Sequence, residues 1–174
     1  MAKDLWYAAQ VRTGSEESVR RQCLDRTSHG VLKDCCVFYY EEKRHIRGEW
    51  VIQERLLFPG YVFFVAKEGY GKETEEELRN IDGVRKLLRI GDEPAALTGE
   101  EVDFLKELGG KAQTVEMSEG IIEQSVIKVY SGPLVGKEKY IRKIDRHKRR
   151  AMLEMPMFGE MRKMQVGLEI VAKS

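Results

Sequence analysis

The chain has 174 residues, with 30 Lys and Arg against 29 Asp and Glu and a hydrophobic content of 42%. This length allows one mid-sized domain or two small ones, and the hydrophobic content excludes wholesale disorder. No apolar run approaches the roughly 18 residues of a membrane helix, and the first ten residues lack the apolar core of a signal peptide. We therefore expect a cytoplasmic protein with no membrane contact.

The charges are divided unevenly along the chain. Residues 121–174 hold 12 Lys and Arg against 6 Asp and Glu, whereas residues 1–120 hold 18 against 23. Opposite net charges predict two units with different partners. The cysteines Cys23, Cys35 and Cys36 lack the spacing of a disulfide framework or a zinc site, and we expect three buried, reduced thiols.

The first part of the chain mixes strands and helices. We expect strands at 5–12, 34–42, 49–57, 61–66 and 84–90, with a charged hairpin loop, "KRHIRGE", before the third of them. Thr13 and Glu16 form the pattern of a capping box at the start of a helix that ends near Gly30, and residues 72–81 form a short polar helix. Thr98 and Glu101 repeat the capping box before a helix that stops at 109–110.

A polar segment, "KAQTVEMSEG", then predicts a linker at 110–120. Beyond it the pattern is that of strands, at 125–130, 139–145 and in two alternating runs. The first alternation turns Ala151, Leu153, Met155 and Met157 inward, and the second does so with 164, 166 and 168. Several short strands in about 50 residues favour a small β-barrel. The predicted fold class is α+β, with an N-terminal antiparallel sheet flanked by helices.

No catalytic constellation emerges from the sequence. His29, His45 and His147 have no Cys or Ser partner nearby in the chain, and no phosphate-binding loop or metalloprotease motif is present. We therefore expect a protein that is not an enzyme and that uses no cofactor and no metal.

The stretch Leu57–Val65, "LFPGYVFFV", places aromatic rings around a Pro-Gly turn. Neighbouring residues of a strand face opposite ways, so one face cannot hold every ring, and Trp6 and Tyr7 pose the same problem. Either both faces are covered and all the rings are internal, or the rings form an exposed patch that binds a protein partner. We expect Phe58 and Tyr61 to be open to water.

The run Lys137–Arg150, "KEKYIRKIDRHKRR", holds eight Lys and Arg against Glu138 and Asp145. It is either a solvated charged hairpin or a surface for phosphates, whose binding releases counterions. Tyr140 would stack on a base, and a basic turn on a small barrel suits the splayed bases of RNA loops.

Four stretches in order resemble the NusG family of transcription elongation factors over nearly the whole chain: "WYAAQVRTGSEESV", "LFPGYVFF", "GVRKLL…GDEPAALTGEEV" and "VIKVYSGPLVGKEKYIRKIDRHKRRAMLEMPMFG". The resemblance implies an NGN-like domain at 1–109, a linker at 110–120 and an SH3-like barrel with a KOW motif at 121–174. It also implies that the first domain docks on the clamp helices of RNA polymerase. The matching positions are Trp6, Tyr7, Phe58, Pro59, Gly60 and Tyr61.

Lys139 stands where the KOW motif of the family usually has glycine, and the surrounding run is unusually basic. This resembles LoaP, a specialised antitermination paralogue, and implies that the barrel binds structured nascent RNA. The expected contacts are Lys137, Lys139, Tyr140, Arg142, Lys143, Arg146, His147, Lys148, Arg149 and Arg150. The hairpin residues Lys43, Arg44 and Arg47 are a secondary nucleic-acid contact.

Two alternatives remain open at this point. In one, the chain is a general NusG factor whose barrel binds the termination factor Rho or a ribosomal protein, and its basic run is only solvated. In the other, it is a ribosome-associated RNA-binding protein, because KOW barrels also occur there. In each case we expect a monomer.

Overall fold

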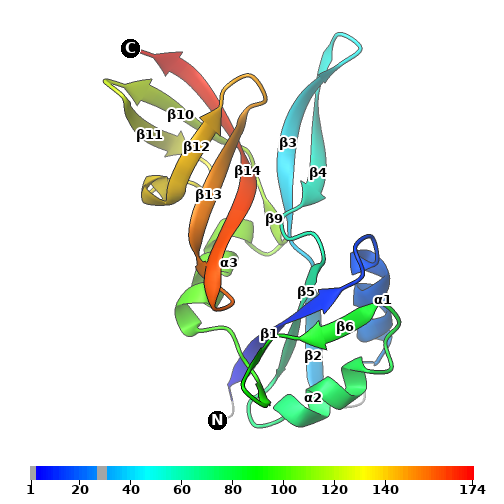
Figure 1. Cartoon of the computed structure of the whole chain (residues 1–174). Helices are drawn as coiled ribbons and strands as arrows, with labels where there is room; N and C mark the ends of the chain where they lie inside the picture. Colours follow the sequence, from blue (N-terminus) through cyan, green and yellow to red (C-terminus); the bar gives the residue numbers. More distant parts are fainter. Residues whose placement is uncertain (1–2, 27–30) are drawn as a thin grey trace. The chain divides into compact units, whose positions relative to one another are not determined.

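A computed structural model describes residues 3–26 and 31–174 (Figure 1). The chain divides into two compact units. Unit 1 comprises residues 1–37 and 58–102, and unit 2 comprises 38–57 and 103–174. The hairpin at 38–57 thus groups with the C-terminal strands, whereas the expected domains, 1–109 and 121–174, assign it to the first part and remain a prediction.

Unit 1 is built on a four-stranded antiparallel sheet in the order β2-β5-β1-β6. The predicted strands at 5–12 and 61–66 and the polar helix at 72–81 are present within a few residues, and the predicted strand at 84–90 is divided in two. The elements are β1 (Asp4–Val11), α1 (Glu16–Arg26), β2 (Leu32–Cys36), β5 (Tyr61–Lys67), α2 (Gly71–Leu78), β6 (Val84–Leu87), β7 (Arg89–Ile90), β8 (Glu93–Pro94) and α3 (Gly99–Gly109), which continues into unit 2.

The two central strands of the unit 1 sheet, β1 and β5, are buried on both faces. Residues 6–9 of β1 and 62–66 of β5 are buried without interruption. Because successive side chains of a strand point to opposite faces, such runs need cover on both sides. Helix α1 packs against β2 and β5, and Phe63 and Phe64 are fully buried on opposite faces of β5.

The three cysteines lie in the core of unit 1, as predicted. Cys23 of α1 and Cys35 and Cys36 of β2 are buried free thiols. Burial raises the pKa of the Cys35 thiol, and its hydrogen bond with Cys23 raises it further. The Cys35 thiol is therefore a protonated packing group rather than a nucleophile.

The two predicted capping boxes have different outcomes. At α3 the prediction is confirmed, because Thr98 N–H donates to Glu101 Oε1 at 2.9 Å and Glu101 N–H donates to Thr98 Oγ1 at 3.2 Å. At α1 it is wrong: the Glu16 carboxylate accepts from the backbone of Gly14 and of Gly60, not of Thr13. The predicted end of this helix, near Gly30, lies outside the described residues.

Unit 2 contains a hairpin of β3 (Tyr39–Ile46) and β4 (Glu49–Leu56). The predicted long loop "KRHIRGE" is wrong, because Lys43 to Ile46 belong to β3 and only Arg47 and Gly48 form the turn. These two residues have φ of 51° and 81°, which is the backbone of a two-residue type I′ turn. The turn pairs His45 with Trp50 across the hairpin.

The predicted linker at 110–120 contains strand residues. β9 (Thr114–Val115) pairs in parallel with β3, and β10 (Ser118–Glu123) is a full strand of the C-terminal sheet. That sheet has the order β11-β10-β14-β13-β12. Its other elements are β11 (Val126–Ser131), the 3₁₀ turn η2 (Glu138–Tyr140), β12 (Ile141–Asp145), β13 (Arg150–Met157) and β14 (Glu160–Lys173).

The alternation predicted for the C-terminal strands is confirmed. Residues 151, 153, 155 and 157 of β13 and residues 164, 166 and 168 of β14 are buried. The turn after β11 needs glycine, since Gly132 has a φ of 96° and a Cβ there would lie 2.6 Å from the Cα of Ser118. The α+β fold class with a small C-terminal β domain is confirmed.

Candidate functional site

The Phe-Pro-Gly stretch forms a tight turn at the entrance to β5. Tyr61 N–H donates to Phe58 O at 3.1 Å, and Gly60 has a φ of 84°, as a type II turn with proline second and glycine third requires. Gly60 N–H donates to Glu16 Oε2 at 3.0 Å, and Val11 N–H donates to Gly60 O at 2.8 Å. The turn is therefore fixed from α1 and from β1.

The expectation that Phe58 and Tyr61 are open to water is wrong for Phe58, and Tyr61 is half-buried. Trp6, Tyr7 and Phe58 are only 8%, 4% and 5% exposed. The ring of Phe63 lies 6.2 Å from that of Trp6 and 5.5 Å from that of Phe58. Because both faces of the central strands are covered, the rings of Trp6, Tyr7 and Phe58 belong to the core. Of the Phe-Pro-Gly-Tyr stretch, Pro59 is exposed, Tyr61 is half-buried and Gly60 is buried.

The basic run contributes one exposed turn between β12 and β13. Arg146, His147 and Lys148 are exposed, and Arg149 is half-buried; we call 146–149 the basic turn. Asp145 Oδ1 accepts from Lys148 N–H at 2.9 Å, and this backbone hydrogen bond lowers the pKa of the Asp145 carboxyl. Asp145 thus shapes the backbone of the turn, while the side chains of Arg146, His147 and Lys148 face solvent.

The beginning of the same run lies at the other end of β12. Lys137 Nζ is 2.9 Å from Glu107 Oε2, and the ring of Tyr140 lies 5.2 Å from that of Phe104, edge to face. Six residue steps along β12, about 20 Å at ~3.3 Å each, separate Tyr140 from Arg146. The structure therefore does not bring Tyr140 to the basic turn.

The other predicted RNA contacts divide into exposed and engaged side chains. Arg142 and Lys143 of β12 are exposed, as is Lys139, which lies over the ring of Tyr140. Arg150 is half-buried, with its guanidinium 3.7 Å from Glu42 Oε1.

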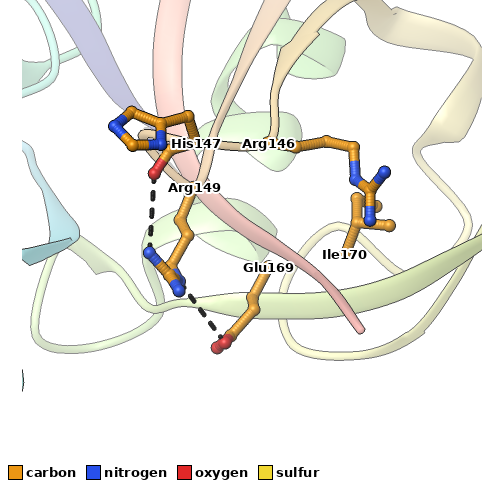
Figure 2. A pocket seen from close by; sticks show the side chains of 5 residues that line it. All are labelled: Arg146, His147, Arg149, Glu169 and Ile170. Carbon is orange, nitrogen blue, oxygen red and sulfur yellow. Dashed lines mark hydrogen bonds and ion pairs between the residues drawn. The ribbon is translucent and has the colours of Figure 1, made fainter. Parts of the chain in front are cut away.

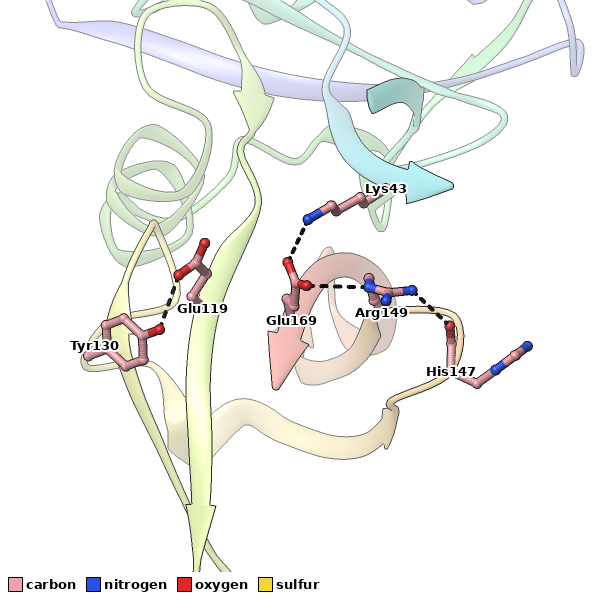
Figure 3. A network of polar contacts seen from close by, with 6 residues as sticks. All are labelled: Lys43, Glu119, Tyr130, His147, Arg149 and Glu169. Carbon is pink, nitrogen blue, oxygen red and sulfur yellow. Dashed lines mark hydrogen bonds and ion pairs between the residues drawn. The ribbon is translucent and has the colours of Figure 1, made fainter. Parts of the chain in front are cut away.

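Glu169 of β14 joins the basic turn to the hairpin (Figure 3). Its Oε2 accepts from Lys43 Nζ at 2.9 Å, and its Oε1 from Arg149 Nε at 3.4 Å. These two cations, Lys43 first, lower the pKa of the Glu169 carboxyl. Lys43, predicted as a secondary contact, thereby lies at the basic turn, whereas Arg44 and Arg47 are exposed on the hairpin.

Trp50 of β4 also lies at this place. The guanidinium of Arg149 is 3.7 Å from the Trp50 ring centroid, Lys43 Nζ is 5.7 Å from it, and the ring of His45 is 4.8 Å away. Even so, 48% of Trp50 is exposed. An aromatic face among cations is a stacking platform for a nucleic-acid base.

Sequence reasoning missed both Trp50 and Glu169. A two-residue turn at Arg47-Gly48 pairs Trp50 with His45 and places Lys43 on the same face of the hairpin. The sequence therefore held a signal for Trp50. For Glu169 the sequence offers no signal, because Lys43 lies 126 positions away and Arg149 lies 20 positions away in a turn.

A pocket of about 330 Å³ opens beside the basic turn. It is lined by Arg146, His147, Arg149, Glu169 and Ile170 (Figure 2). Arg149 also donates to the backbone O of His147 at 3.5 Å. Three cationic or titratable side chains around one carboxylate suit a small anion better than an apolar ligand.

Within residues 3–26 and 31–174, no group of three His, Cys, Asp or Glu side chains could hold a metal ion. No helix in this part of the chain has both the length and the apolar character needed to cross a membrane.

Comparison with known proteins gives matches along nearly the whole chain. A family model described as "Transcription termination factor nusG" matches residues 4–106. "Transcription termination/antitermination protein NusG" of Deinococcus radiodurans is 26% identical over 186 residues, covering 97% of this chain and 98% of that protein. The protein of the same name from Staphylococcus aureus is 26% identical over 176 residues, covering 97% and 94%.

Among solved structures, "Domain interaction in Thermotoga maritima NusG" aligns with a TM-score of 0.58. The alignment covers 97% of this chain and 94% of the other, at 20% identity. A likeness at this identity shows a shared fold.

Proposed function

Because the chain belongs to the NusG family of transcription factors, we propose that it is an elongation and antitermination regulator that holds RNA polymerase through its N-terminal part and structured nascent RNA through its basic turn. Members of this family are transcription factors rather than enzymes. The proposal includes a domain division at 1–109 and 121–174, and a cytoplasmic location, because such a factor has to reach the polymerase.

The polymerase contact is proposed at the Phe-Pro-Gly turn. Exposed Pro59 and half-buried Tyr61 would touch the clamp helices, while buried Trp6, Tyr7 and Phe58 support the turn from below. A turn fixed in advance loses little entropy on binding. A factor that binds the closed clamp better than the open one shifts the polymerase toward the closed state, and the polymerase then pauses less.

The RNA contact is proposed at the basic turn and at Trp50. The single observation that carries it is that the basic turn exposes Arg146, His147 and Lys148 and places its Arg149 3.7 Å from the Trp50 ring, which is itself 48% exposed. Cations would neutralise phosphates and release counterions, while the ring would stack on an unpaired base. Structured RNA offers such bases in its loops and bulges.

A transcription assay on a template with a terminator, with and without a leader RNA element, tests this proposal. We expect terminator readthrough that depends on the leader. Reversing two charges of the basic turn, Arg146→Glu with Lys148→Glu, should remove that dependence. The matched control, Lys163→Glu with Lys173→Glu, changes net charge equally at exposed positions of β14 and should behave as wild type.

A general elongation factor is the second candidate, and the engaged cations favour it. Lys137, Arg149 and Arg150 already pair with carboxylates of unit 2, which leaves less positive charge for phosphates. The C-terminal domain would then bind Rho or a ribosomal protein. In that case Lys139→Gly combined with charge reversal at Arg146 and Arg149 would leave readthrough unchanged, and the leader would have no effect.

A further inference from the structure

The pocket beside the basic turn contains an anion that belongs to the protein itself. Glu169 lines the pocket together with Arg146, His147 and Arg149 (Figure 2). Its side chain is 24% exposed, and both of its oxygens face cations, Lys43 on one side and Arg149 on the other. The lowered pKa keeps this carboxylate charged.

A carboxylate between two cations has the chemistry of a bound phosphodiester. Both groups present two oxygens that share one negative charge, and arginine and lysine bind either of them through charge-assisted hydrogen bonds. Arg149 cannot give its Nε–H to Glu169 and to an incoming phosphate with full strength at once. The Glu169 carboxylate would also repel a phosphate that enters the pocket.

We propose that the pocket of Arg146, His147 and Arg149 is a phosphate subsite for the RNA backbone, and that Glu169 fills it in the free protein and competes with RNA. This inference rests on the proposed RNA contact and adds to it a residue that sets the affinity for RNA. An RNA that offers only phosphates has to displace Glu169 and gains no other contact at this site. An RNA that also presents an unpaired base to Trp50 gains a further contact that offsets this cost, so with Glu169 in place only such an RNA binds well.

The effect of removing this anion follows from counterion release. Glu169→Gln keeps the shape of the side chain and removes its charge, so that Lys43 and Arg149 become available to phosphates. Each additional phosphate contact steepens the dependence of log affinity on log salt by about 0.7 for single strands. We expect affinity for a single-stranded RNA of random sequence to rise about tenfold at low salt, and affinity for a structured target that fills the same subsite to rise by a similar factor.

Fluorescence anisotropy with full-length protein and a labelled random 20-nucleotide RNA, over a range of salt concentrations, measures this effect. The matched control is Glu123→Gln. Glu123 pairs with Lys128 at 2.8 Å on β10 and β11, so this variant also removes one paired carboxylate from the C-terminal sheet, but outside the pocket. We expect the control to bind as wild type does; equal binding by the two variants would overturn the inference.

A second variant distinguishes the effect of the phosphate subsite on RNA affinity from the effect of the net charge of the protein. Adding Arg149→Gln to Glu169→Gln should remove most of the gain in random-RNA affinity, because Lys43 is then the only one of the two released cations that remains. A retained gain would overturn the role of Arg149, and a thermal unfolding scan checks that each variant is folded. If the wild type binds no RNA, structured or random, the proposed function fails; if it binds and Glu169→Gln changes nothing, only this inference fails.

Discussion

The Phe-Pro-Gly turn and the basic turn are each contacted by a carboxylate from another element, but the two carboxylates act differently. Glu16 is 2% exposed and accepts two backbone N–H groups, from Gly14 and Gly60. Glu169 is partly exposed and faces two side-chain cations. The first fixes a conformation, because its partners are backbone groups, and the second fixes a charge balance. The same residue type therefore stabilises one turn and regulates the other.

The largest expected effect comes from removing the buried carboxylate. Glu16→Ala leaves the Gly60 N–H buried without its acceptor, and we expect the free energy of unfolding to fall by about 2–3 kcal/mol. Urea unfolding measures it. The neighbouring change Glu17→Ala removes a part-exposed pair with Arg20 and should cost about 0.5 kcal/mol. Equal losses would mean that Glu16 does not hold the turn.

The next effect concerns the exposed ring at the basic turn. Trp50→Ala should weaken binding of structured RNA by about 1–2 kcal/mol, because one stacked base is lost. The chain has two tryptophans, and Trp6 is buried whereas Trp50 is half exposed, so RNA should quench the fluorescence of Trp50. Quenching that persists in Trp50→Phe would contradict the stacking role, and Trp6→Phe should retain it.

A smaller effect is expected from the glycine of the Phe-Pro-Gly turn. A Cβ at Gly60 would lie 3.6 Å from its nearest neighbour, so Gly60→Ala introduces no clash. We expect the free energy of unfolding to fall by about 1 kcal/mol, because a residue with a Cβ adopts a positive φ only at a cost. Thermal unfolding measures the loss. Gly99→Ala, at a position with open space and no positive φ, should be neutral or slightly stabilising; an equal loss there would remove the conformational explanation.

The smallest effect is the pH dependence of the stability that the Glu169 carboxylate contributes. Its folded pKa lies below the ordinary value of 4.5, so the stability it contributes is fully present above pH 4.5 and is lost as pH falls through the lowered pKa. Wild type should exceed Glu169→Gln by about 0.5 kcal/mol near neutral pH. The two should converge in acid; a constant gap would show that the charge is not responsible.

The sequence predicted elements whose signal is local. Leu153 and Met155 alternate with polar or half-buried neighbours on a strand with one buried face, and Thr98 and Glu101 meet within one helical turn. The capping box at Glu16 failed because its carboxylate finds Gly60, 44 positions away. No local pattern reports a partner at that distance.

The predicted sites failed where burial depends on what covers a face. Alternation showed that Trp6 and Phe58 could not share one face with every other ring, but not that both faces of the sheet are covered. Composition identified the basic run, but it did not identify the carboxylates that pair with it. Lys43 and Glu169 are 126 residues apart, and their pairing depends on tertiary packing that charge counts do not contain.

The hydrogen bond between Gly60 and Glu16 also bears on how unit 1 folds. Joining positions 44 residues apart requires closure of a long loop, which is slow compared with forming a local turn. The Phe-Pro-Gly turn would reach its final geometry only after α1 has docked, late on the folding route. Glu16→Ala should then accelerate unfolding and leave the refolding rate nearly unchanged in stopped-flow measurements; slower refolding would instead place this contact in the folding nucleus.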